Sequence, residues 1–288
     1  MKKISCLFLA IVISYYSSAQ KDFKKYYHLI NKGNDAFDSA KYSNASIYFI
    51  RAFKKVKNPF SKDLNRAAII NIKLNQLEIA KKYYRHAALY GFIPADSTLK
   101  KISTNDSQPF LSELKNINLT QTNKFNKIFS NIIDSLYKID QNIRGTQKFT
   151  KNGLNIDSLN TLYLLKEIVQ FGFPSEINVG VETANKAFII FLHADFDIEN
   201  VLLGAFLLKA VRSGEFKPVN YAEIVDRRCN FSGRPFIYYQ VPFGYDALPK
   251  TEKDKVTAMR YEIGLRSVEK TIQYKFLPDG SLQIWIKE

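Results

Sequence analysis

A pattern of small and aromatic residues recurs after 35 residues near the N-terminus, and this repeat constrains the fold more than any other feature of the chain. The paired positions are Gly33 and Ala68, Ala45 and Ala80, Phe49 and Tyr84, and Ala52 and Ala87. Two helices that cross closely need small side chains at the crossing and an aromatic ring to fill the space beside it. The pattern therefore predicts two successive helical hairpins that stack on one another.

This arrangement resembles the tetratricopeptide repeat. The resemblance covers about residues 23–92 and two units, and Pro59 falls where the first unit should end. Stacked helix pairs of this kind do no chemistry by themselves and form a surface that holds a peptide or another protein. A plain pair of helical hairpins is the alternative interpretation of the same spacing.

The positive charge of the chain is concentrated in the same segment. Residues 20–92 hold 15 Lys and Arg against 5 Asp and Glu, whereas residues 140–288 hold 19 and 18, within a total net charge of +15. We expect a basic surface that includes Lys54, Lys55, Lys81 and Lys82 and attracts an acidic protein segment or an anionic envelope component, with peripheral membrane contact as a further form of this attraction. A solvated helix face is the alternative.

The first nineteen residues have the features of a secretory signal peptide. Two lysines precede an apolar run over residues 4–13, and small residues at 17–19 favour cleavage after Ala19. The run is shorter than the roughly 20 residues that span a membrane, so a retained anchor is the less favoured alternative. The sequence thus predicts an exported protein, periplasmic or extracellular, with no nucleic-acid partner.

Apolar periodicity predicts a series of helices in the second half of the chain. A helix is expected over residues 124–139, and others from an N-cap at Asp157 to Gly172, from an N-cap at Thr183, from about 197 to 213, after Pro218, and over 251–265. Residues 235–241, 271–276 and 281–287 are expected as strands, the last two joined by a tight turn. The predicted fold class is mainly α (α+β), in which tetratricopeptide-like hairpins precede an α-rich domain with a small antiparallel β-sheet.

These signals divide the chain into four parts. We expect a signal peptide over 1–19, helical repeats over 20–92, a connection over 93–123 and an α-rich domain over 124–288. The connection is rich in Ser, Asn, Asp and Thr, with a short helical patch from Phe110 to Leu114. It is either a partly ordered link or a third, degenerate repeat.

Residues 136–266 carry short motifs in a characteristic order. They are Asp140…Arg144, Asp157, Gly172-Phe173-Pro174, Gly180, His193-Ala194-Asp195, Gly214-Glu215, Asp226-Arg227, Gly233-Arg234-Pro235, Tyr239-Gln240, and Arg260 with Gly264. The series resembles an uncharacterised bacterial family, a domain of unknown function often exported or fused to helical repeats. The chain departs from that family at Phe173, where the family tends to have Trp, and at Leu192, where it tends to have Gln. The resemblance implies no activity, cofactor or substrate.

Four residues are candidates for catalysis. His193 is the only histidine after residue 93, which excludes a multi-histidine zinc site there, and Asp195 follows it closely. A histidine beside carboxylates is either a general base or a hydrogen-bonded structural group. Together with Asp226 and Arg227, which diverge on a helix and must serve different partners, these residues form the hypothetical site of a hydrolase or lyase.

Four further residues are candidates for binding. Asp140 and Arg144 lie one helical turn apart, so they either pair directly or both face a cleft, and Gln240 and Arg260 complete the set. Buried structural ion pairs would explain the same residue types. No nucleophile elbow, phosphate loop or zinc-protease motif is present in the sequence, and we expect no cofactor and no metal. The sequence favours protein–protein interaction or scaffolding through the basic repeats over an enzyme or a structural envelope-assembly factor.

Overall fold

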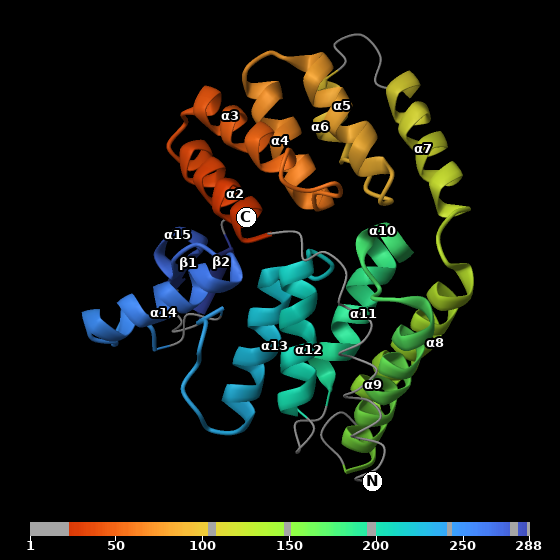
Figure 1. The fold of residues 1–288 in the computed structure, drawn as a ribbon, viewed down its shortest axis with the longest axis vertical. Coiled ribbons are helices and arrows are strands. Elements are labelled where there is room, and N and C mark those ends of the chain that lie inside the picture. The colour runs from red at the N-terminus through yellow and green to blue at the C-terminus, as the bar shows by residue number, and fades with distance from the viewer. Residues whose placement is uncertain are drawn as a thin grey trace. The chain divides into compact units, whose positions relative to one another are not determined.

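The computed structural model describes residues 23–102, 108–146, 151–194, 200–240, 244–276 and 282–286 (Figure 1). The predicted signal peptide lies outside these ranges. Within them, no helix is both long enough and apolar enough to cross a membrane. The chain divides into two compact units: unit 1 holds the described residues of 32–194, and unit 2 holds those of 23–31 and 200–286.

The repeat segment of unit 1 is a succession of helices in which each contacts the next or the next but one. Their bounds are α2 (Phe23–Asp38, of which the second half belongs to unit 1), α3 (Tyr42–Phe53), α4 (Ser61–Lys73), α5 (Leu77–Ala88), α6 (Asp96–Ile102) and α7 (Gln108–Thr122). Contacts join α3 to α4, α4 to α5, and α5 to both α6 and α7. The helical, repeat-like arrangement expected from the spacing is observed (Figure 1).

The repeated small and aromatic residues make the close contacts between these helices. A Cβ atom at Gly33 would lie 2.6 Å from the ring of Phe49, so a larger residue would not fit there without movement of the ring. The other repeated positions are all at most 1% exposed: Ala45, Phe49, Ala52, Ala68, Ala80, Tyr84 and Ala87. The spacing therefore marks the packed face of each hairpin.

The segment 93–123 is more helical than predicted. It contains α6 and α7 rather than a short helical patch around Phe110. Leu99, Ile102, Phe110 and Leu114 are buried in one cluster with Tyr84 of α5. A third helical pair therefore continues the stack beyond residue 92.

The remaining helices of unit 1 are α8 (Lys127–Thr146), α9 (Lys151–Phe171), α10 (Glu176–Val179) and α11 (Val181–His193). Helix α8 contacts α9 and α11. The buried carboxylate of Glu176 accepts the backbone N–H of Ser61 at 2.8 Å, and the N–H of Val181 donates to the carbonyl of Tyr90 at 2.8 Å. These bonds tie the repeat helices to the helices that follow them.

Two predicted helix caps are wrong. Asp157 lies inside α9, which begins at Lys151, and α11 begins at Val181 directly after Gly180 rather than after Thr183. Both residues are of a type that favours an N-cap, but the neighbouring sequence continues the helix through them.

Unit 2 is built from the first half of α2 together with α12 (Asn200–Ser213), α13 (Pro218–Phe231), α14 (Lys250–Ile263) and α15 (Val268–Thr271). The Tyr27 hydroxyl donates to the Val211 carbonyl at 2.8 Å. The rings of Phe23 and Tyr27 lie against Gly214 and Gly264, where a Cβ atom would come within 1.8 and 2.5 Å of them. Both glycines also have positive φ, +75° and +94°, so the first residues of unit 2 pack on positions that only glycine suits.

The predicted α+β class is wrong, because the structure is a helical, repeat-like arrangement. The strand predicted for 235–241 is absent, and the described part of that segment contains bends. Near the C-terminus, β1 (Ile272–Phe276) and β2 (Leu282–Ile286) pair antiparallel with each other, from Ile272 opposite Ile286 to Phe276 opposite Leu282. The strands predicted over 271–276 and 281–287 are thus present as a two-stranded ribbon, which no third strand joins within the described ranges.

Candidate functional site

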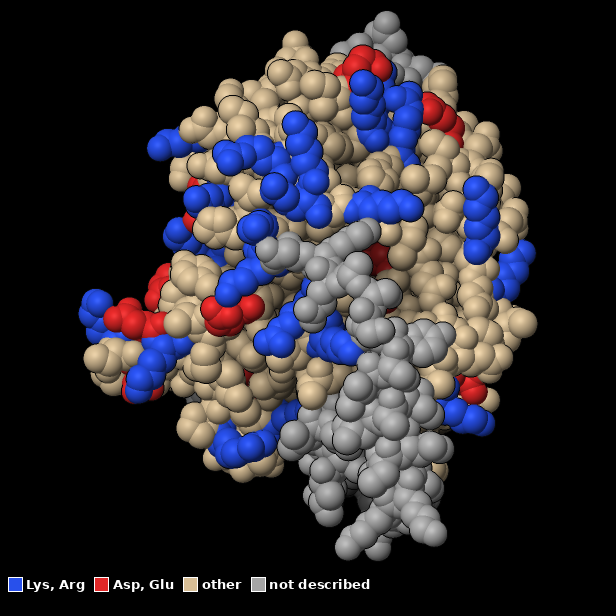
Figure 2. Space-filling model, viewed as in Figure 1, with Lys and Arg blue, Asp and Glu red and all other residues tan. Residues whose placement is uncertain are grey.

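The four lysines predicted to bind an anionic partner lie on or beside two repeat helices. Lys54 and Lys55 directly follow α3, and both are exposed, as is Lys82 of α5. The Lys81 ammonium lies 2.8 Å from the Glu78 carboxylate, so its charge is already paired. Figure 2 shows basic side chains gathered over the part of unit 1 that α3–α5 form, where residues 41–92 contain eleven Lys and Arg and two Asp and Glu.

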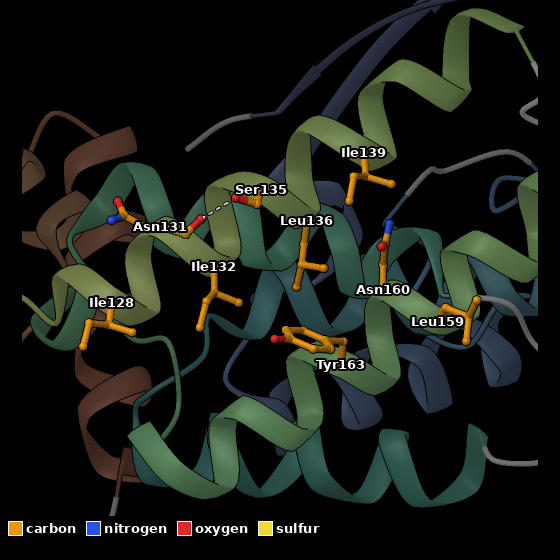
Figure 3. Close-up of a pocket in the computed structure, with 9 residues that line it drawn as sticks. All are labelled: Ile128, Asn131, Ile132, Ser135, Leu136, Ile139, Leu159, Asn160 and Tyr163. Atoms are coloured by element: carbon orange, nitrogen blue, oxygen red, sulfur yellow. Dashed lines mark hydrogen bonds between the residues drawn. The ribbon is translucent and has the colours of Figure 1, made fainter.

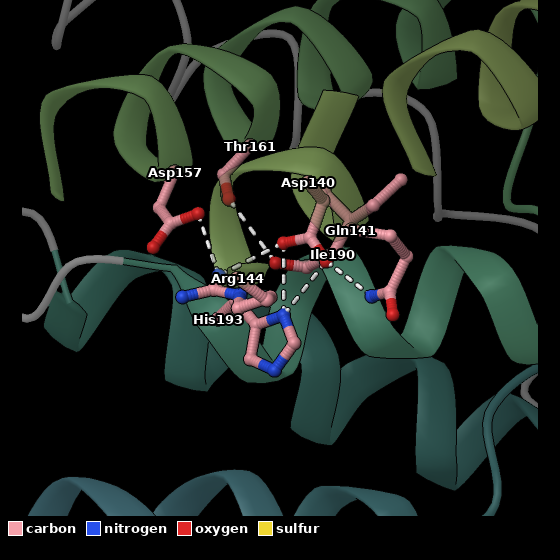
Figure 4. Close-up of polar contacts among 7 residues, drawn as sticks. All are labelled: Asp140, Gln141, Arg144, Asp157, Thr161, Ile190 and His193. Carbon is pink, nitrogen blue, oxygen red and sulfur yellow. Dashed lines mark hydrogen bonds and ion pairs between the residues drawn. The ribbon is translucent and has the colours of Figure 1, made fainter. Parts of the chain in front are cut away.

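The structure brings His193, Asp140 and Arg144 together in a polar cluster of unit 1 (Figure 4). His193 ends α11, and its Nδ1 lies 2.8 Å from Oδ1 of Asp140 and 3.0 Å from Oδ2. Arg144 donates to Asp140 at 2.9 Å and to Asp157 of α9 at 2.6 Å, and Gln141 donates to Asp140 at 2.7 Å. Of the two alternatives left open for Asp140 and Arg144, direct pairing is the one observed, and the cluster joins α8, α9 and α11.

The pKa values of the two carboxylates of this cluster are shifted in opposite directions. Both carboxylates are buried. Burial alone would raise the pKa of Asp140, but hydrogen bonds from His193 and Arg144 outweigh it and hold that pKa below its usual value. Burial raises the pKa of Asp157, because Arg144 only partly offsets it. Asp140, which contacts both His193 and Arg144, is therefore the carboxylate whose ionised form the cluster stabilises.

The chemistry open to the cluster follows from the orientation of His193. With Nδ1 donating to Asp140, the lone pair of a neutral imidazole is on Nε2, as a general base requires. Within the described part of the chain, no hydroxyl or thiol hydrogen-bonds to that nitrogen, and no group of three His, Cys, Asp or Glu residues could hold a metal. Asp195 lies outside the described residues. The cluster thus provides an oriented histidine. Its bond to Asp140, together with the ion pairs of Arg144 with Asp140 and Asp157, links α8, α9 and α11.

In unit 2, Asp226 of α13 supports the segment that was predicted as a strand. Its Oδ1 accepts the backbone N–H groups of Ile237 and Tyr238 at 3.0 and 2.8 Å, and its Oδ2 accepts that of Gln240 at 2.6 Å. Burial raises the pKa of Asp226, and the three N–H donors oppose this shift. Because both oxygens are engaged with the backbone, Asp226 acts as a support for the loop.

Arg260 supports the same loop by donating to the backbone carbonyl of Tyr238. The fully buried guanidinium donates to the carbonyl of Arg266 at 2.6 Å, to the carbonyl of Tyr238, and to the Thr271 hydroxyl at 3.2 Å. Burial lowers the pKa of Arg260 to about 10. The Gln240 amide is buried, with no side-chain hydrogen bond within the described residues. Asp226, Gln240 and Arg260 are therefore grouped around one loop.

Arg227, the neighbour of Asp226, serves a different partner. Its guanidinium lies 4.9 Å from the centre of the Phe231 ring, one turn further along α13. The predicted divergence of Asp226 and Arg227 on their helix is confirmed. The contacts of the candidate catalytic residues fall in different units. His193 bonds to a carboxylate of unit 1. Asp226 binds backbone groups of unit 2, and Arg227 lies beside a ring of unit 2.

An apolar groove of about 670 Å³ between α8 and α9 was not predicted from the sequence (Figure 3). Its lining residues are Ile128, Asn131, Ile132, Ser135, Leu136 and Ile139 of α8, and Leu159, Asn160 and Tyr163 of α9. The apolar residues of α8 were identified as a periodic helix face, but the period alone does not show that part of this face is uncovered.

Sequence reasoning also missed the place of Asp157 beside Arg144. These two residues lie on either side of the short link between α8 and α9. Helices joined by a short link are antiparallel neighbours, so residues near the link face one another, and this signal could have found the pair.

Comparison of the chain with protein-family models, with curated proteins and with solved structures gives no match. The resemblances to the tetratricopeptide repeat and to the bacterial family of unknown function therefore stay predictions. Function has to be inferred from the geometry of the chain itself.

Proposed function

We propose that this protein is an interaction scaffold that binds an acidic segment of another protein through the basic surface of its helical repeats. The observation that carries the proposal is a set of exposed lysines that directly follow α3 or lie on α5. Lys54, Lys55, Lys57 and Lys82 are all exposed, and none forms an ion pair with a carboxylate in the described part of the chain. Like charges held on one rigid set of helices attract a polyanion and speed its association.

Hydrolase or lyase chemistry at His193 is the second candidate function. It is favoured by the hydrogen bond that Nδ1 of His193 donates to Asp140, which leaves Nε2 to act as a base. An ester-hydrolysis screen of the full chain against a His193→Gln variant tests it. Activity that survives the substitution would exclude His193 as the base.

The scaffold proposal is tested by charge reversal with a matched control. The test variant carries Lys54→Glu, Lys55→Glu, Lys57→Glu and Lys82→Glu. The control makes the same change of charge on four exposed lysines elsewhere in unit 1, at Lys100, Lys101, Lys115 and Lys124. Circular dichroism checks that both variants keep their helical content.

The probe is a fluorescent twelve-residue oligoglutamate peptide, and its binding is measured by fluorescence anisotropy. We expect the test variant to bind at least tenfold more weakly, because each exposed charge pair contributes up to about 1 kcal/mol. Wild-type binding should also weaken as salt rises from about 0.1 to 1 M, where the Debye length falls from about 10 to 3 Å. Equal weakening in the control would show a general effect of net charge and contradict the proposal, as would binding only to vesicles of anionic lipid.

A further inference from the structure

The α8–α9 groove is a continuous apolar face at the surface of unit 1. Ile128, Ile132, Leu136 and Ile139 follow one another at helical spacing along α8, and Tyr163 of α9 points toward them (Figure 3). Ile128 is 66% exposed, and Leu159 and Tyr163 of α9 are 63% and 46% exposed. Isolated exposed apolar residues are common on proteins, but a lined groove of them indicates a surface that another molecule covers.

The dimensions of this groove suit an α-helix. The apolar row from Ile128 to Ile139 covers twelve residues, and its eleven steps of 1.5 Å span roughly 16 Å, which is about three helical turns. Two contacting helices leave a furrow between them into which the ridge of a third helix packs. A helix in such a furrow is anchored by apolar residues at positions i, i+4 and i+7.

The border of the groove is positively charged. Lys127 and Lys138 lie on the same row of α8 as Asn131 and Ser135, which line the groove, and both lysines are exposed. The Lys166 ammonium of α9 lies 5.8 Å from the centre of the Tyr163 ring. None of these three lysines forms an ion pair with a carboxylate in the described ranges. The complementary partner therefore carries Asp or Glu beside its apolar row.

A buried donor in the groove adds a second requirement. The Asn160 side chain lines the groove and is 5% exposed, and its Nδ2 has no hydrogen-bond partner among the described residues. Leaving a buried donor without an acceptor costs about 1–3 kcal/mol. Because Nδ2 is closed to solvent, the Asn160 side chain would rotate toward the groove to donate to a side-chain oxygen of the partner.

We propose that the α8–α9 groove binds an amphipathic helix of a partner protein, with apolar residues at i, i+4 and i+7, acidic residues beside them and a side-chain oxygen that reaches Asn160. This site is separate from the lysines that follow α3 and from Lys82 of α5, and the inference does not rest on the scaffold function proposed for them. It assigns a second partner surface to unit 1.

The experiment selects peptides rather than assuming one. A display library of random sixteen-residue peptides is selected for binding to the full chain. Peptides that also bind the Ile128→Asp variant are removed. We expect the enriched peptides to share the apolar spacing and to hold more Asp and Glu than Lys and Arg. Synthetic copies should bind Ile128→Asp at least tenfold more weakly and Asn160→Leu about threefold more weakly.

The matched control is Ile47→Asp on α3, because Ile47 is 53% exposed and lies outside the groove. It should leave peptide affinity unchanged, as should the reversal of the four lysines, so the two proposals fail separately. No enrichment, or enriched peptides without the apolar spacing, would overturn the proposal. Two other results would also overturn it. If the chain dimerises and Ile128→Asp abolishes the dimer, the occupant of the groove is a second copy of the chain. If the chain binds anionic vesicles and Ile128→Asp abolishes that binding, the occupant is a membrane.

Discussion

One added methyl group at Gly214 tests how the N-terminal residues pack in unit 2. Gly214 directly follows α12, and its φ is +75°. A Cβ atom built there would lie 1.8 Å from Cζ of Phe23, whose side chain is 4% exposed. Gly214→Ala therefore forces Phe23 out of its place in the core, in addition to straining the backbone.

The expected loss of stability has two parts. An alanine in the left-handed region costs roughly 1–2 kcal/mol. Displacement of a buried Phe costs up to the roughly 3–5 kcal/mol measured when such a ring is removed. Gly233 provides the matched control, because its φ is +64° and no described atom beyond its chain neighbours lies within 4 Å of the added Cβ. We expect Gly233→Ala to show only the backbone part and Gly214→Ala to lose about 2–5 kcal/mol more.

Urea unfolding measures both variants, followed by circular dichroism and by the fluorescence of Trp285, the only tryptophan, in β2 of unit 2. A double variant, Phe23→Ala with Gly214→Ala, separates the two parts. Without the ring, Gly214→Ala should cost no more than Gly233→Ala. Equal losses for Gly214→Ala and Gly233→Ala, or full additivity in the double variant, would refute the placement of Phe23.

Two further predictions concern the buried charges. Asp140→Asn should lower the free energy of unfolding at pH 7 by about 2–4 kcal/mol. The pKa of Asp140 is held below its unfolded value of about 3.9, so the wild type should lose this contribution to the free energy of unfolding as the pH falls from about 5 to 2. Urea unfolding of Asp140→Asn should show a smaller loss of that free energy over the same range. Arg260→Met should cost about 3–5 kcal/mol in thermal unfolding, since it removes the guanidinium that donates to the Tyr238 and Arg266 carbonyl oxygens. Lys255→Met on the exposed face of α14 should stay within about 0.5 kcal/mol, and similar losses in the two would contradict the role given to Arg260.

Local signals were sufficient where a helix has a regular apolar face and a clear start. The helix predicted after Pro218 is α13, and that predicted over 251–265 is α14, within two residues at each end. The pairing of Asp140 with Arg144 also followed from their spacing, because residues four apart on a helix are neighbours.

Signals failed where distant residues decide the conformation. The run from Phe236 to Tyr239 is aromatic and β-branched, which favours a strand, but Asp226 and Arg260 bind its backbone N–H and carbonyl groups and hold it in bends. No local pattern contains that information. The partnership of His193 with Asp140 likewise spans 53 residues and depends on the packing of α11 on α8.

The polar composition of 93–123 was misleading for a related reason. Ser, Asn and Thr suggested a link, yet the few apolar residues at 99, 102, 110 and 114 fall where two short helices can bury them. Short amphipathic helices of this kind are stable only against a neighbour, here α5, so their propensity alone is a weak guide.

The discontinuity of unit 2 along the chain affects the order in which the protein folds during synthesis. Tyr27 and Asn31 bond to residues 184 and 233 positions later. At ribosomal rates of about 5–20 residues per second, these contacts wait roughly 10 to 50 s after the first segment has emerged. Unit 1 can begin to assemble in that interval, whereas the aromatic start of α2 stays without its final neighbours until α12 and α14 have been made. The last step in the folding of unit 2 therefore waits for α14, and it closes loops of 184 and 233 residues.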